Sequence, residues 1–190
     1  MQAFLVSTAV VAIGEIGDKT QLLALLLAAR FGRPVPIIAG ILASTLLNHA
    51  LAGLLGGWIR SAVDPAVLRW VLGVSFLAIA AWALVPDRLE KEKDSARLGK
   101  YGVFAVTFAA FFFAEIGDKT QLATVALAAR FDNLVAVVAG TTAGMLIADV
   151  PAVLLGEKAA ARLPLKAIRY VAAAAFAVLG VAVLASGFLS

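Results

Sequence analysis

Long apolar stretches separated by short polar breaks run along the whole of this chain. A transmembrane helix needs about 20 mostly apolar residues. Stretches that reach or approach this length span residues 2–29, 35–58, 67–85, 101–129, 134–156 and 168–189. The pattern therefore predicts an all-α integral membrane protein with six transmembrane helices, of which the first and fourth carry charged residues in their middles.

The composition supports a membrane protein and removes several other classes. Of 190 residues, 63% are hydrophobic and only 15% are charged, whereas about 25% are charged in a soluble domain. This excludes a disordered protein and argues against a soluble fold, because so small an interior could not bury the apolar side chains. The absence of cysteine excludes disulfides, iron–sulfur clusters and thiolate zinc sites.

The basic residues predict the orientation. With the N-terminal end on one side, the loops 30–34, 86–100 and 157–169 fall on the other, and they carry eleven Lys and Arg residues. The opposite side holds only Arg60, Arg69 and Arg130. Because cytoplasmic loops are richer in Lys and Arg, both termini are expected outside the cytoplasm. The net charge of +4 is then explained by the basic loops on the cytoplasmic side. It does not require a nucleic-acid partner, and the expected partner is the lipid bilayer.

The chain contains an internal repeat. Residues 15–31 read EIGDKTQLLALLLAARF, residues 115–131 read EIGDKTQLATVALAARF, and thirteen of these seventeen positions are identical. We predict a single transmembrane domain, 1–190, made of repeat one (1–85), a cytoplasmic linker (86–100) and repeat two (101–190). Because each repeat has three spans, the second must be inverted relative to the first, as in many secondary transporters.

The repeated motif places acids inside the first and fourth spans. An acid at the centre of a membrane helix costs roughly 2.5–3.5 kcal/mol on insertion scales, so it faces a partner or a cavity. Across an inverted repeat the acids would form an oxygen cage that suits Ca²⁺, Mg²⁺ or Mn²⁺. The expected metal ligands are Glu15, Asp18, Glu115 and Asp118, with Thr20, Gln21, Thr120 and Gln121 as additional candidates. Glycine within the motif allows close helix approach or a local break.

Charge balance favours a divalent ion. The four acids together with Lys19 and Lys119 sum to −2, which one divalent ion or two protons would neutralise. We therefore hypothesise an exchange of one divalent ion against up to two protons. A plainer interpretation is that each Lys forms an ion pair with the Glu four residues before it.

Further polar residues lie in the second and fifth spans. His49 and Asp149 occupy equivalent positions of the two repeats, and Asn48 precedes the first. Together with Lys19 and Lys119 they are candidates for a proton relay, a gate or contacts to the metal ligands. The alternative is that they are buried polar residues satisfied by a neighbouring helix.

The doubled E-x-G-D-[KR]-[ST] motif in a six-span chain resembles the Gdt-type cation/proton antiporter family. That family includes Golgi Ca²⁺/Mn²⁺ transporters and bacterial manganese exporters. The resemblance implies that Glu15, Asp18, Glu115 and Asp118 bind metal and protons. It also implies Mn²⁺ export from the cytoplasm, with Ca²⁺ as the other candidate, in a bacterial cell membrane. No resident cofactor is expected, only the transported cation.

Two other functions remain as alternatives. A passive divalent-cation channel would also fit duplicated acidic motifs, although lysines facing a pore would repel cations. An intramembrane hydrolase is more remote, because His49 is the only histidine and the metalloprotease motif H-E-x-x-H is therefore absent. The sequence leaves the oligomeric state, including a homo-oligomer, and the ratio of protons to metal open.

Overall fold

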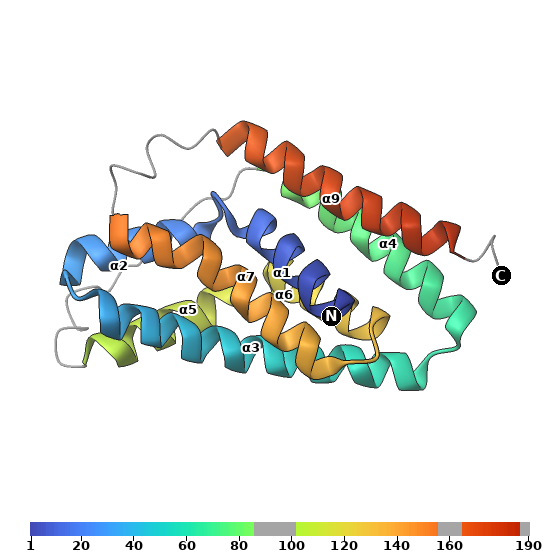
Figure 1. Ribbon diagram of the computed structural model, residues 1–190, viewed down its shortest axis with the longest axis horizontal. Coiled ribbons are helices and arrows are strands. Elements are labelled where there is room, and N and C mark those ends of the chain that lie inside the picture. Colours follow the sequence, from blue (N-terminus) through green and yellow to red (C-terminus); the bar gives the residue numbers. More distant parts are fainter. Residues whose placement is uncertain (86–101, 156–164, 187–190) are drawn as a thin grey trace.

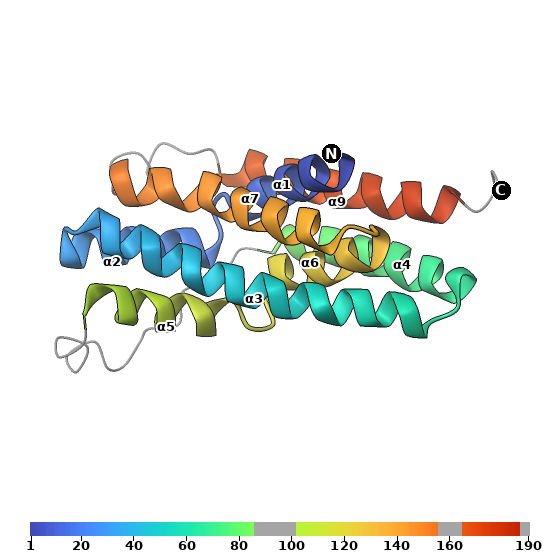
Figure 2. The ribbon, with the colours of Figure 1, turned by 60° about the horizontal axis from the view of Figure 1, so that its bottom comes forward.

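The computed structural model describes residues 1–85, 102–155 and 165–186, and every regular element in these ranges is an α-helix, which confirms the all-α prediction. The helices form an elongated bundle (Figures 1 and 2). In chain order they are α1 (Gln2–Glu15), α2 (Lys19–Phe31), α3 (Pro34–Ala62), α4 (Pro65–Ala83), α5 (Val103–Glu115), α6 (Lys119–Arg130), α7 (Leu134–Leu155) and α9 (Leu165–Ala185). The predicted linker 86–100 lies outside the described residues.

The structure differs from the expected six continuous spans in the first and fourth stretches. Within the described ranges, α3, α4 and α7 are long and apolar enough to cross a membrane. The first and fourth apolar stretches are instead each divided into two helices, α1 with α2 and α5 with α6. None of these four helices exceeds 14 residues, so none alone reaches the roughly 20 residues of a complete span.

Glycine and aspartate explain where these two stretches break. Gly17 and Gly117 have φ angles of 82° and 74°, a left-handed conformation that glycine adopts without steric cost. The following residues, Asp18 and Asp118, are the N-caps of α2 and α6 and accept hydrogen bonds from backbone N–H groups of the first turn. The motif thus ends one helix and begins the next, so of the two expected roles for its glycine the local break is the one observed at Gly17 and Gly117.

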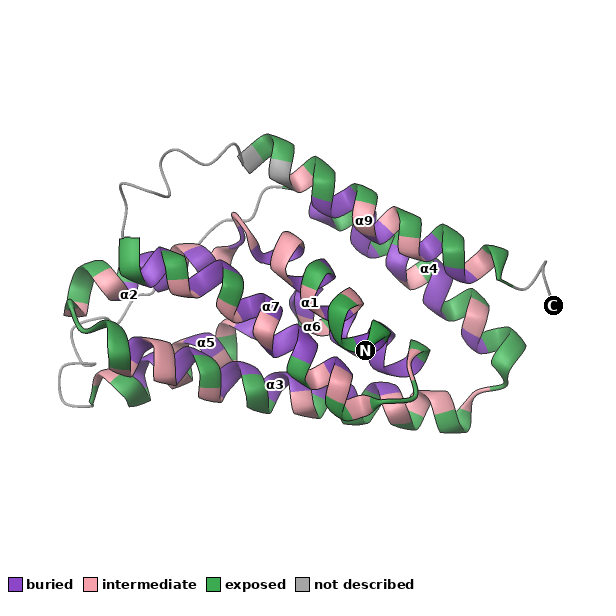
Figure 3. Cartoon of the chain, in the orientation of Figure 1, coloured by how far each residue is buried: buried purple, intermediate pink, exposed green. Residues whose placement is uncertain are grey.

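Polar side chains are buried inside the bundle, whereas many large apolar side chains are exposed on its surface; Figure 3 shows how buried and exposed positions are distributed along the helices. On α3, Ser44, Thr45 and Asn48 are buried, whereas Leu51 and Leu54 are more than half exposed. In water this distribution would be unfavourable, because the hydrophobic effect drives apolar side chains inward. It suits a protein whose outer surface contacts lipid.

The two repeats contact each other in a reciprocal way. The helix α1 packs against α7, and its repeat equivalent α5 packs against α3, the equivalent of α7. A Cβ atom added at Gly40 on α3 would lie 2.8 Å from Thr107 on α5, and one at Gly140 on α7 would lie 3.0 Å from Ser7 on α1. Both glycines and both partners are separated by the 100-residue repeat offset. Each repeat therefore packs its first helix onto the other repeat.

Candidate metal centre

Three acids from the two motifs converge inside the bundle. Glu15 is the last residue of α1, and Asp18 and Asp118 are the N-caps of α2 and α6. Each offers one carboxylate oxygen, and these three oxygens all lie within 4.8 Å of one another. All three residues are at most 1% exposed. The two helix breaks thus bring acids from both repeats to one place.

Each motif lysine forms an ion pair with the aspartate of the other repeat. Lys19 Nζ lies 3.0 Å from Asp118 Oδ1, and Lys119 Nζ lies 3.0 Å from Asp18 Oδ1. The simpler interpretation, an ion pair with the glutamate four residues earlier, does not describe these contacts. The lysines therefore join the two repeats and offset the repulsion between the acids.

The motif glutamines form hydrogen bonds with the backbone at the two helix breaks. The side-chain oxygen of Gln21 accepts a hydrogen bond from Gly17 N at 2.8 Å, and that of Gln121 accepts one from Gly117 N at 2.7 Å. Gln21 Nε2 also donates to the Ala148 carbonyl on α7 at 3.0 Å. These oxygens satisfy backbone donors that the helix break leaves without an intrahelical partner.

The motif threonines differ between the repeats. Thr120 Oγ1 donates to Asp118 Oδ2 at 3.1 Å. Thr20 Oγ1 is buried and has no hydrogen-bond partner among the described residues. Thr20, two residues after Asp18, therefore has a buried hydroxyl oxygen that a cation could use.

Glu115, the fourth expected ligand, lies outside the group of three converging oxygens. Thr45 Oγ1 donates to its Oε1 at 2.8 Å, and Asn48 Nδ2 donates to its Oε2 at 3.2 Å. Asn48 also donates to the Phe112 carbonyl at 3.1 Å. Sequence reasoning selected Asn48 but missed Thr45, which lies three residues earlier on the same face of α3 and could have been found from that spacing.

The repeat equivalents of these donors are apolar. Thr45 corresponds to Met145 and Asn48 corresponds to Ala148. Both carboxylate oxygens of Glu15, the equivalent of Glu115, are buried without a hydrogen-bond partner among the described residues. The two glutamates thus occupy chemically different surroundings although their motifs are identical.

The polar pair of the second and fifth spans is buried within the bundle. Asp149 on α7 is close enough to Glu15, Asp18 and Glu115 to interact with them electrostatically. His49 on α3 is fully buried, and neither of its ring nitrogens has a hydrogen-bond partner among the described residues. Asp149 therefore lies near the acids. Neither the Asp149 nor the His49 side chain has a hydrogen bond to any of the described residues.

The arrangement is chemically suited to a hard divalent cation. It offers carboxylate and hydroxyl oxygens, the ligands that Ca²⁺, Mg²⁺ and Mn²⁺ prefer. The N-terminal ends of α2 and α6 carry a partial positive charge that stabilises the neighbouring acids. Half-helices that meet in this way near the middle of the bundle are common at the binding sites of secondary transporters.

Comparisons with known proteins agree with this chemistry. Residues 3–91 and 103–190 match the family described as divalent cation/proton antiporter GDT1, one match for each half of the chain. A protein of Vibrio cholerae named "Putative manganese exporter" is 50% identical over 183 residues, which cover 96% of this chain and 90% of the relative. The GDT1-like protein sll0615 of Synechocystis is 31% identical, covering 88% of this chain and 89% of that protein. The chloroplastic PAM71-homolog of Arabidopsis thaliana is 30% identical over 94% of this chain and 58% of that protein.

No solved structure matches this chain. The match to both halves nevertheless settles the class of protein, which is a multi-pass membrane transporter and not an enzyme. Divalent cations and protons are its substrates. The chain belongs to the GDT1 family of divalent cation/proton antiporters.

Proposed function

We propose that this protein exports Mn²⁺ from the cytoplasm of a bacterial cell in exchange for protons. The convergence of Glu15, Asp18 and Asp118 within 4.8 Å is the observation that carries the proposal. Their hard oxygens suit Mn²⁺ and Ca²⁺ alike. The relative named as a manganese exporter favours Mn²⁺.

We propose that Glu15, Asp18 and Asp118 bind the metal, with Thr20 beside them, and that Glu115 and Asp149 complete the charge of the site. These five acids and the two motif lysines carry a net charge of −3. A bound divalent ion leaves −1, which one proton neutralises, whereas the metal-free site takes up three protons to become neutral. Since an uncompensated charge in a low dielectric is costly, each divalent ion exchanges for two protons.

We propose that the chain crosses the membrane as two inverted three-helix repeats, 1–85 and 101–190, with 86–100 as a cytoplasmic linker and both termini outside. The start of α1, the end of α9 and the α3–α4 turn lie toward the same end of the bundle (Figure 1), as this topology requires. The reciprocal packing at Gly40 and Gly140 supports two related halves. Alternating access then arises from rocking of one repeat against the other.

The test is Mn²⁺ flux into proteoliposomes with and without an imposed pH gradient, with Ca²⁺ measured in parallel. If the protein is an antiporter, Mn²⁺ entry must be accompanied by proton exit, so the vesicle lumen becomes more alkaline. An imposed gradient with an acidic lumen must accelerate Mn²⁺ entry. Asp118→Asn should abolish both the Mn²⁺ flux and the accompanying pH change. It removes the negative charge of one of the three converging carboxylates, which is also the ion-pair partner of Lys19.

A matched control is Asp132→Asn. Asp132 is 89% exposed and pairs with Arg60 away from the converging acids, so its loss should leave flux unchanged. Metal flux that ignores the pH gradient would instead indicate a passive channel. Unchanged proton-coupled flux in Asp118→Asn would show that the converging acids do not bind the metal.

A further inference from the structure

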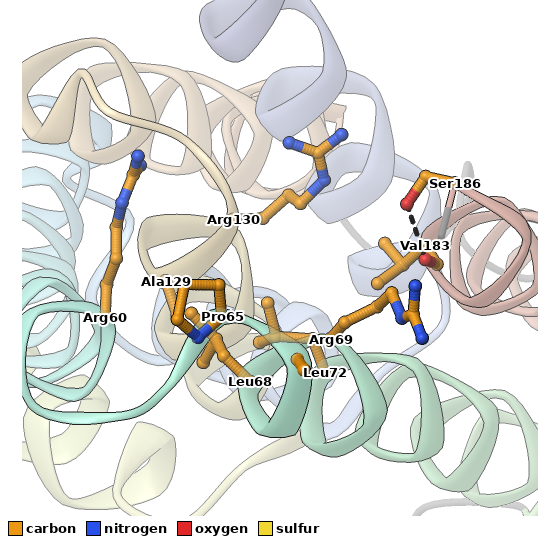
Figure 4. Close-up of a pocket in the computed structure, with 10 residues that line it drawn as sticks. Arg60, Pro65, Leu68, Arg69, Leu72, Ala129, Arg130, Val183 and Ser186 are labelled. Atoms are coloured by element: carbon orange, nitrogen blue, oxygen red, sulfur yellow. Dashed lines mark hydrogen bonds between the residues drawn. The ribbon is translucent and has the colours of Figure 1, made fainter. Parts of the chain in front are cut away.

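A second polar site lies at one end of the bundle, where α3, α6 and α9 end and α4 begins. An open cavity of about 490 Å³ lies there (Figure 4). Three arginines line it, each from a different helix: Arg60 on α3, Arg69 on α4 and Arg130 on α6. None of the motif residues lines this cavity, so it is separate from the converging acids.

The cavity is strongly cationic. Among the residues that the structure describes, no acid lines it, and a guanidinium keeps its charge at any physiological pH. Arg60 pairs with Asp132, whose side chain is 89% exposed, and exposed ion pairs of this kind contribute little. Arg60 Nη1 and Arg69 Nε have no hydrogen-bond partner among the described residues. The guanidiniums therefore retain charge and hydrogen-bonding capacity for an anion.

The remaining lining is largely apolar. Leu68, Leu72 and Val183 are at most 9% exposed and form part of the wall. Ser186 also lines the cavity, and its hydroxyl donates a hydrogen bond to the Val183 carbonyl at 2.7 Å (Figure 4). A small inorganic anion would use only the arginines. A ligand with a phosphate at one end and hydrocarbon at the other would use both surfaces.

Aromatic residues indicate where this end of the bundle lies in the membrane. Trp58 and Trp70 are 66% and 54% exposed and stand close in the chain to Arg60 and Arg69. Exposed tryptophans of membrane proteins concentrate at the level of the lipid headgroups. The cavity therefore lies at the depth at which phospholipid phosphates are found.

We propose that this cavity binds a phosphate group on Arg60, Arg69 and Arg130, and that the lipid headgroup is the source its apolar wall favours over free phosphate. Arginine suits this role because its planar fork donates two parallel hydrogen bonds to phosphate oxygens. The bound lipid would hold the ends of α3, α4, α6 and α9 together.

The experiment uses the full-length protein, purified and delipidated in an uncharged detergent. Its thermal unfolding midpoint is measured against added dioleoylphosphatidylglycerol, dioleoylglycerol, which lacks the phosphate, and inorganic phosphate. Phosphatidylglycerol should raise the midpoint and dioleoylglycerol should not. An equal rise of the midpoint with inorganic phosphate alone would support phosphate binding by the cavity, but with free phosphate and not a lipid headgroup as the ligand.

The variants are Arg69→Gln with Arg130→Gln, and Arg130→Gln alone, which changes an exposed side chain and should fold normally. Each lost guanidinium should raise the phosphatidylglycerol concentration needed for half of the midpoint shift about tenfold. Native mass spectrometry should show that the double variant retains less phospholipid.

The control is Arg30→Gln. Arg30 is the repeat equivalent of Arg130, stacks on Phe31 as Arg130 stacks on Phe131, and does not line the cavity. It should leave the lipid response unchanged. The proposal is overturned if the arginine variants respond to phosphatidylglycerol like the parent, or if dioleoylglycerol stabilises the protein equally.

Discussion

Removing Lys119 tests the pairing between repeats directly. Its ammonium lies 3.0 Å from Asp18, and the two side chains are 4% and 0% exposed. Breaking a buried ion pair by deleting one partner costs about 3–5 kcal/mol, because it leaves an uncompensated charge. We therefore expect Lys119→Met to lower the free energy of unfolding of the metal-free protein by roughly that amount. Lys19→Met is the matched variant, and its effect should be smaller because the Lys19 side chain is 28% exposed and screened by solvent.

The assay is equilibrium unfolding in mixed micelles, arranged as two double-mutant cycles. One cycle combines Lys119→Met with Asp18→Asn, and the other combines it with Glu115→Gln, the partner expected from helical spacing alone. Coupling should be large in the first cycle and small in the second. The reasoning is refuted if Lys119 couples to Glu115 as strongly as to Asp18, or if Lys119→Met and Lys19→Met are equally mild.

Four further variants test individual contacts and the helix break in the same unfolding assay. Thr45→Val removes the hydrogen bond to Glu115 and should cost about 1–3 kcal/mol; no loss would show that this bond contributes nothing. Gly56→Ala should be destabilising by about 1–3 kcal/mol, because its Cβ would clash with the Val125 carbonyl oxygen of α6, whereas Gly57→Ala, with nothing within 4 Å, should be neutral or slightly stabilising. Gly117→Ala should cost about 1–2 kcal/mol through its φ of 74°, and equal folding and transport by this variant would argue against a required break.

The apolar pattern predicted the all-α class and the position of three long helices. Hydropathy located α3, α4 and α7 because each of these helices is long, apolar and uninterrupted. It did not reveal that the first and fourth stretches are each two helices, since their composition stays apolar across the break. The glycine of the motif carried that information, but spacing alone cannot distinguish a close helix contact from a left-handed turn.

The candidate site was predictable in its residue types but not in its partners. The motif identified Asp18 and Lys119, yet helical spacing pairs each lysine with its own glutamate, and only the tertiary fold shows the exchange between repeats. The unequal surroundings of Glu15 and Glu115 were likewise hidden. The surroundings depend on the helix of the other repeat that packs against each glutamate. For Glu115 that helix is α3, which supplies Thr45 and Asn48, whereas the equivalent positions of α7 are Met145 and Ala148.

The ion pairs between the two repeats also imply that one repeat alone is too small to transport. A repeat expressed alone would contain an aspartate without its lysine and a lysine without its aspartate, although its own sequence holds one of each. Two such fragments would have to assemble before either could neutralise its buried charges. Assembly of separated halves into a transporting pair would therefore be driven by the same contacts that hold the converging acids together, and neither half could change its lysine or aspartate without affecting the other.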